Sequence, residues 1–80
     1  MDISYRIAKR IGELVERLGL MHSDVASKMK LEINRYNRLR KGDVTATDKE
    51  LRHLLEVKED LEEIDGRLDG YGRRKRYLEK

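Results

Sequence analysis

Residues 22–42 are the stretch that most restricts how this chain can fold. They carry apolar residues at helical spacing in two short segments with only a tight break between them. The apolar residues are Val25, Ala26 and Met29 in the first segment and Ile33, Tyr36 and Leu39 in the second. Gly42 follows the second segment, where a glycine commonly ends a helix. The stretch therefore predicts two short helices set against each other, the second of them basic and polar.

A helix is predicted on each side of this stretch. Residues 3–18 repeat apolar side chains at helical spacing, with Asp2 or Ser4 available to cap the start and Gly19 to close the end. The repeating residues are Ile3, Ile7, Ile11, Leu14, Val15 and Leu18. Thr47 and Glu50 have capping-box spacing and predict the start of a fourth helix. The leucines expected to close the core from that helix are Leu51, Leu54 and Leu55.

The two-helix stretch resembles the helix-turn-helix of the lambda repressor and Cro family, also called the Xre type. The matching residues are Val25, Ala26 and Met29 in the first helix, Leu31 in the turn, Tyr36 and Leu39 in the second helix, and Gly42 at its end. The resemblance extends over about residues 7–57 and implies an all-α, compact, five-helix domain. Two residues depart from the family pattern. Lys30 replaces the usual turn glycine and is expected to adopt a positive φ, and Met21 replaces a serine or threonine N-cap.

The resemblance implies sequence-specific binding of double-stranded DNA by a transcriptional regulator, a repressor acting as a homodimer on a two-fold operator. The second helix would then enter the major groove. The residues implied to read or adjoin base edges are Ile33, Asn34, Arg35, Asn37 and Arg38, and those implied to contact phosphates are His22, Ser23, Arg40 and Lys41. Arginine and asparagine suit guanine and adenine edges, and an apolar side chain suits a thymine methyl. Ile33 could instead extend the core stripe.

Charge is segregated along these 80 residues, whose formal net charge is +3. Residues 1–42 have ten Lys/Arg against five Asp/Glu, a net charge of +5; residues 43–70 have four against ten, −6; residues 71–80 have five against one, +4. A basic half beside an acidic segment is expected where one face meets phosphates. A solvated charged surface is the alternative explanation.

The sequence predicts neither an enzyme nor a metal or cofactor site. It has no cysteine, and its two histidines, His22 and His53, are far apart, His53 being expected on the exposed side of the fourth helix. Its serines have no nearby base or glycine-rich elbow, and no phosphate-cradling loop is present. Charges interrupt residues 1–20, so no signal peptide or membrane span is expected. We expect a cytoplasmic protein with no small-molecule substrate.

The C-terminal third suggests a second interaction surface. Apolar residues recur there in steps of three and four, as in a coiled-coil seam. They are Leu54, Val57, Leu61, Ile64, Leu68 and Tyr71. We divide the chain into a DNA-binding domain (1–57), a C-terminal helix (58–71) and a basic tail (72–80) that contacts DNA or is merely solvated, with a break in helical order expected among the glycines of residues 65–72.

This C-terminal helix either folds back as a fifth helix or pairs with a second subunit through Leu61, Ile64 and Leu68. A rival function is a protein-interaction module, antitoxin-like or adaptor-like, in which the acidic helix binds a partner and the helix-turn-helix is structural. Salt dependence separates the two functions, because binding through several phosphates weakens steeply as salt rises.

Overall fold

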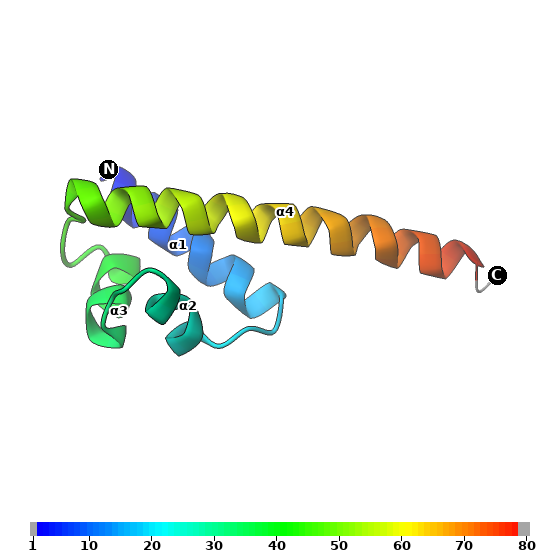
Figure 1. Ribbon diagram of the computed structural model, residues 1–80, viewed down its shortest axis with the longest axis horizontal. Helices are drawn as coiled ribbons and strands as arrows, with labels where there is room; N and C mark the ends of the chain where they lie inside the picture. Colours follow the sequence, from blue (N-terminus) through cyan, green and yellow to red (C-terminus); the bar gives the residue numbers. More distant parts are fainter. Residues whose placement is uncertain (1, 79–80) are drawn as a thin grey trace.

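The computed structural model describes the backbone of residues 2–78 and the side chains of residues 2–67. This part of the chain forms four α-helices and no strand: α1 (Ile3–Arg17), α2 (His22–Lys28), α3 (Ile33–Lys41) and α4 (Asp48–Leu78). α1 lies against α4 on one side and against the α2–α3 pair on the other (Figure 1). The prediction of an all-helical fold is therefore confirmed. None of these helices is both long and apolar enough to cross a membrane.

The predicted caps form at the start of α1 and of α4. The carboxylate of Asp2 accepts the backbone N–H of Ser4 at 3.1 Å. Thr47 and Glu50 form a reciprocal capping box, in which each side chain accepts the backbone N–H of the other residue at 2.8 and 3.2 Å. The Ser4 hydroxyl is buried and accepts the N–H of Ala46 at 3.2 Å. This bond ties the first turn of α1 to the segment that leads into α4.

The core lies where the four helices meet. Its buried apolar residues are Ile7, Ala8, Ile11, Leu14, Val15, Val25, Ala26, Met29, Tyr36, Leu39, Leu54 and Leu61. α1 contributes five of these and contacts each of the other helices, so it is the central element. Each large apolar side chain that is fully buried stabilises the fold by about 1.5–3 kcal/mol relative to its exposed state.

One core assignment made from the sequence is wrong: Leu55 was expected to help close the core but is 40% exposed. Leu61 was expected either to fold back with its helix or to pair with a second subunit, and it is only 5% exposed and lies in the core. Ile3, the first residue of the apolar repeat, is exposed. Leu54 and Leu61 are seven residues apart and so share the face of α4 that meets the core, whereas Leu55 is turned about 100° away from it. Ile3 lies one turn ahead of Ile7, the first residue of α1 in the core.

The prediction of five helices is also wrong for the described chain, because α4 is a single continuous helix. The predicted break among the glycines of residues 65–72 does not occur. Each glycine costs about 1 kcal/mol of helix propensity, and no proline is present to remove a backbone hydrogen bond. The divisions at residues 57–58 and 71–72 both fall inside α4. The side chains of Leu68 and of the basic segment 72–80 lie outside the described residues.

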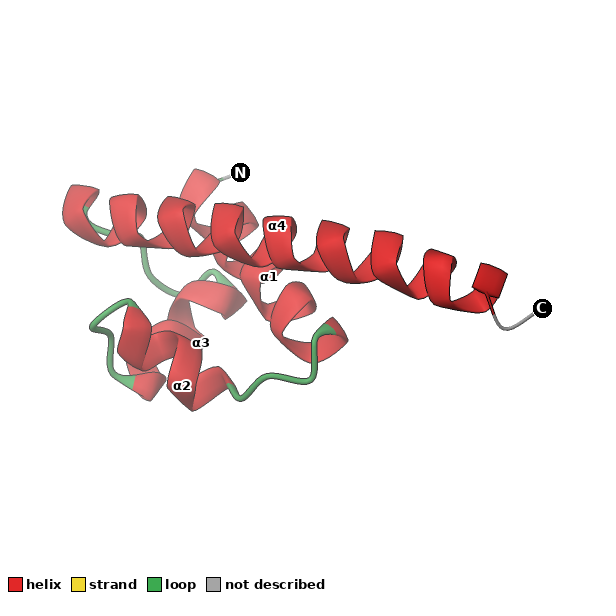
Figure 2. Ribbon diagram, turned by 45° about the vertical axis from the view of Figure 1, so that its right-hand side comes forward, coloured by secondary structure: helices red, strands yellow, loops and turns green. Residues whose placement is uncertain are grey.

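α4 extends well beyond the body formed by α1, α2 and α3. Arg10 of α1 pairs with Glu62 at 3.3 Å and Arg17 pairs with Asp65 at 3.0 Å, so α1 and α4 run in the same general direction. α1 ends at Arg17, whereas α4 continues for more than ten residues past Asp65. Figures 1 and 2 both show the last turns of α4 with no other helix beside them.

Candidate nucleic-acid interface

The turn between α2 and α3 sets the position of the basic helix. The N–H of Lys30 donates to the carbonyl oxygen of Ser27 and the N–H of Leu31 donates to that of Ala26, both at 2.9 Å. These two bonds form a Schellman motif, in which the residue after the helix adopts the left-handed conformation. The same pattern ends α1 at Gly19 and α3 at Gly42, where φ is 69° and 80°.

Lys30 takes the left-handed position at the end of α2. Its φ is 57°, and it is the only non-glycine residue with a positive φ in the described chain. The expectation drawn from the missing turn glycine is therefore confirmed. Met21, which replaces the usual serine or threonine, makes no side-chain cap at the start of α2, also as expected.

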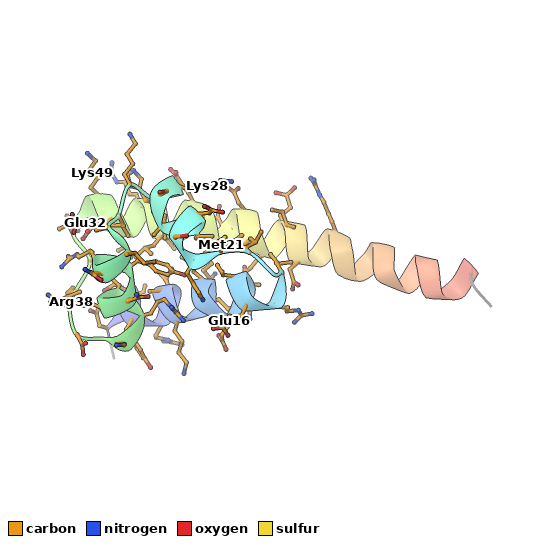
Figure 3. All side chains as sticks on the ribbon, turned by 90° about the horizontal axis from the view of Figure 1, so that it is seen from below. Glu16, Met21, Lys28, Glu32, Arg38 and Lys49 are labelled. Atoms are coloured by element: carbon orange, nitrogen blue, oxygen red, sulfur yellow. The ribbon has the colours of Figure 1, made fainter. Side chains whose placement is uncertain are left out.

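One face of α3 is open to solvent. Ile33, Asn34, Arg38 and Lys41 are exposed, and Asn37 is half-buried among them. At 100° per residue these five positions fall within about 140° of the helix circumference. Ile33 is 40% exposed and so does not extend the core stripe, which settles the alternative left open by its sequence. Arg38 lies on the outer side of α3, away from α1 and α4 (Figure 3).

The opposite face of α3 is anchored by Tyr36 and Leu39, which are completely buried. The Tyr36 hydroxyl lies 2.8 Å from Nδ1 of His22, so α3 is joined to the start of α2. Burial raises the pKa of that hydroxyl, because a phenolate would lose its hydration there. The arrangement fixes the rotation of α3 about its axis and therefore determines which side chains face outward.

His22 and Arg40 take part in this anchoring. Nε2 of His22 lies 3.6 Å from the Glu16 carboxylate, and the Arg40 guanidinium lies over the Tyr36 ring at 5.4 Å and 3.8 Å from Glu16. Gly12 gives Arg40 its room, because a Cβ there would come within 2.6 Å of the Arg40 Nε. The two predicted phosphate ligands are thus half-buried and engaged with the fold, whereas Ser23 and Lys41 are exposed.

Arg35 holds α3 against α4. Its guanidinium donates to both carboxylate oxygens of Glu50, at 2.8 and 3.1 Å, and to the carbonyl oxygen of Thr45 at 3.1 Å. The hydrogen bonds from Arg35 lower the pKa of Glu50 from 4.5 to about 2. Arg35 was predicted beside the base-reading residues, but it lies outside the exposed arc of α3, and its side chain is occupied by Glu50. The same glutamate caps α4, so one carboxylate links α3, the loop and α4.

Lys9 of α1 joins the exposed basic face, and the sequence alone did not distinguish it. A shallow groove of about 210 Å³ between α1 and α3 is lined by Lys9, Asn37 and Lys41 together with Arg40 and acidic residues of α1. Arg10 and Arg17 of the same helix instead pair with α4. The sequence indicated on which side of its helix Lys9 lies. It did not indicate that this side lies next to α3.

His53 is half-buried, contrary to the expectation that it faces solvent. Its Nδ1 lies 3.2 Å from the carbonyl oxygen of Met29 and must donate a hydrogen to it. The bond joins α4 to the turn between α2 and α3, where Met29 caps α2. Nothing in the local sequence could place that carbonyl beside α4.

The geometry thus gathers four of the predicted base-edge residues on one exposed face, Ile33, Asn34, Asn37 and Arg38, and assigns Arg35 to the fold. The described residues contain no group of three or more His, Asp or Glu side chains that could hold a metal ion. Comparison with models of known protein families, with curated proteins and with solved structures finds no match for this chain.

Proposed function

We propose that this protein is a sequence-specific regulator that binds double-stranded DNA through α3 and acts as a transcriptional repressor. The observation that carries the proposal is the exposed face of α3, where two asparagines, an arginine and an isoleucine project from a helix whose other face is locked into the core. These side chains match what the major groove offers: guanine and adenine edges and the thymine methyl.

Two features of the anchoring support major-groove binding. α3 is nine residues long, about 13 Å, and its outer face is not covered by another element of the described chain (Figure 3). The hydrogen bond of Tyr36 fixes α3 to the start of α2. The Arg35–Glu50 pair fixes α3 to α4. A recognition helix must present its side chains in a fixed rotation, because a helix that rolled would exchange one set of base contacts for another.

Phosphate contacts in this proposal come from Ser23 and Lys41, with Lys9 added by its place beside Lys41. These contacts position the helix without reading sequence. His22 and Arg40 contact Tyr36 and so help to fix the orientation of α3. Their replacement would therefore weaken DNA binding indirectly, by altering the position of α3. The base-reading set is accordingly Ile33, Asn34, Asn37 and Arg38.

We further propose a homodimer that binds a two-fold operator, because a single short recognition helix contacts too few base pairs for high specificity. The test is selection of bound sequences from a random duplex pool, followed by affinity measurements across salt concentrations. An inverted repeat is the expected result. With two lysine–phosphate contacts per subunit, log K should fall with log[salt] with a slope of about −3 to −4.

The rival interaction-module function predicts a different outcome of the same experiment. No sequence would be enriched, and any residual affinity for DNA would be equal for selected and random duplexes. That result would refute the proposal even if the protein proved dimeric.

A further inference from the structure

An apolar groove runs along α4 on the side of the α1–α2 loop. It has a volume of about 300 Å³ and is lined by Leu20, Met21, Val57, Leu61 and Ile64, with charged residues at its edges. Met21 is 64% exposed and Ile64 is 43% exposed, and Leu20 is exposed as well. Side chains of this kind in one place mark a surface that another chain covers.

The lining of the groove reaches Ile64, just before the part of α4 that projects from the body. In that part the backbone is helical to Leu78, although no other helix lies beside it (Figures 1 and 2). An isolated helical segment of this length is marginal in water, and three glycines weaken it further. Its sequence nevertheless keeps the apolar steps of three and four that begin in the groove, at Leu68 and Tyr71, and Leu78 follows after a step of seven. The pattern is that of a helix with a partner.

The distribution of charge along α4 indicates that its partner is a second copy of the same helix. The stretch of α4 beside the groove is acidic, with six Asp/Glu among residues 56–65 against one lysine, whereas residues 73–76 are all basic. A second copy lying parallel would place acidic beside acidic and basic beside basic. A second copy lying antiparallel would place the basic end of each α4 on the acidic middle of the other.

We propose that two copies of this chain pair through α4 in antiparallel orientation, each inserting the end of its helix into the groove of the other. In this orientation the apolar steps of the two helices coincide when position 64 lies opposite position 68 of the second copy. The same register brings positions 57 and 61 opposite positions 75 and 71 of the second copy. Position 60, in the lining of the groove, then lies beside position 74 of the second copy, and each contact occurs twice by symmetry.

Charge exchange tests the pairing by sedimentation or light scattering at micromolar concentration. The intact chain is expected to be a dimer. Asp60→Arg alone and Arg74→Asp alone each turn two attractions into repulsions and should weaken dimerisation roughly tenfold or more. The variant that carries both exchanges should recover the affinity of the intact chain. A monomeric intact chain, or a double variant no better than the single ones, would overturn the proposal.

Cysteine crosslinking tests the direction of the helices, since the chain has no cysteine of its own. Val57→Cys mixed with Lys75→Cys should form a disulfide between unlike chains, because the two positions face each other in the antiparallel register. Val57→Cys alone should not, since its two copies would lie about 27 Å apart along the pair, beyond the reach of a disulfide. A disulfide formed by Val57→Cys alone shows parallel helices and contradicts the inference.

These results are independent of DNA binding. An antiparallel dimer that enriches no DNA sequence would refute the proposed function and leave this interface standing. A monomer that enriches a sequence would refute this interface and the proposed homodimer, and would leave DNA binding through α3 standing. Circular dichroism of each variant checks that helical content is kept, and Val57→Cys is a change of small volume at a half-buried position.

Discussion

Arg38 is the residue whose replacement tests the DNA-facing surface most directly, because it is exposed and lies outside the anchoring contacts of α3. We expect Arg38→Ala to cost about 1–3 kcal/mol of affinity at the selected site and to relax the preference at one base pair. The free energy of unfolding should barely change. Titration of selected and random duplexes with this variant measures both effects.

The matched control is Arg10→Ala, which removes the same charge from the side of α1 that pairs with α4. It should leave the sequence preference intact. Lys41→Ala should weaken the binding of all duplexes alike and make the salt slope shallower by about one for each phosphate that is no longer bound. If Arg38→Ala behaved like Lys41→Ala, Arg38 would be a phosphate ligand.

Lys30 adopts a left-handed backbone conformation that is unfavourable for a residue with a side chain. A left-handed residue with a side chain costs about 1 kcal/mol relative to glycine, and Lys30 is exposed with a φ of 57°. We expect Lys30→Gly to raise the free energy of unfolding by roughly 0.5–1 kcal/mol. Urea denaturation of the two proteins measures the difference.

The reciprocal control is Gly19→Lys at the end of α1. Gly19 has a φ of 69°, and a Cβ there would contact nothing within 4 Å, so only the backbone preference changes. The substitution should destabilise the fold by a similar amount. Equal stability of all three proteins would mean that these turns do not hold the left-handed conformation in solution.

At the scale of the element, the rotational phase of each helix decides which leucines matter. Leu39 of α3 is completely buried, whereas Leu55 of α4 is 40% exposed. We expect Leu39→Ala to destabilise the protein by about 2–5 kcal/mol and Leu55→Ala by less than about 1 kcal/mol. Thermal unfolding of the pair compares identical chemical changes at the two positions, and similar midpoints would show that the phase of α3 is misplaced.

The Arg35–Glu50 pair couples α3 to α4 and makes stability depend on acid. Since the pKa of Glu50 is about 2 in the folded protein and 4.5 is its ordinary value, the charged pair stabilises the fold above pH 4.5. That contribution is lost as the pH falls toward 2. We expect Glu50→Gln to cost about 2 kcal/mol at pH 7 and much less at pH 2.

Denaturant unfolding of the intact chain and of Glu50→Gln at both pH values tests this coupling. Glu59→Gln, at an exposed position of the same helix, is the control and should follow the intact chain at each pH. Since glutamine can also complete the capping box, a Glu50→Gln effect that is as large at pH 2 as at pH 7 would mean that the ion pair does not account for the loss.

At the scale of the whole molecule, the proposed α4 pair sets the distance between the two copies of α3. Arg35 ties α3 to Glu50, and the centre of the pair, near Gly66, lies sixteen residues further along α4. At 1.5 Å per residue the two Glu50 positions are at least about 48 Å apart, more than one 34 Å turn of DNA. Two half-sites face the same side of the duplex only at whole turns.

We therefore expect the half-sites of the selected inverted repeat to be centred about two turns, roughly 21 base pairs, apart. This differs from the one-turn spacing that is commonest for helix-turn-helix dimers. Insertion of five base pairs between the half-sites should abolish cooperative binding, whereas insertion of ten should weaken it less. Strongest binding at a one-turn spacing would contradict the antiparallel pair but not the assignment of α3.

Much of the local structure was determined by the sequence itself. The caps at Asp2 and Thr47, the ends at Gly19 and Gly42, and the positive φ of Lys30 were all predicted and are all present. The caps and the glycine ends depend on residues fewer than six positions apart, so short-range hydrogen bonding and backbone sterics are sufficient to specify them. The positive φ of Lys30 was expected from the family resemblance and is held against the steric preference of the residue. The all-helical fold class follows from periodicities of the same short range.

Contacts between distant segments were decided only by the tertiary structure. The family resemblance implied DNA contacts for Arg35, His22 and Arg40. In the structure their side chains instead contact Glu50, Tyr36 and Glu16, respectively. The sequence also left open whether Leu61 packs against the body or a second subunit, and it divided α4 in two. A charged or apolar side chain has the same local pattern whether it faces solvent or another helix. Which of the two it faces depends on the orientation of α3 and α4 relative to α1. That orientation is determined by the burial of Tyr36, Leu39, Leu54 and Leu61 in one core with the apolar residues of α1.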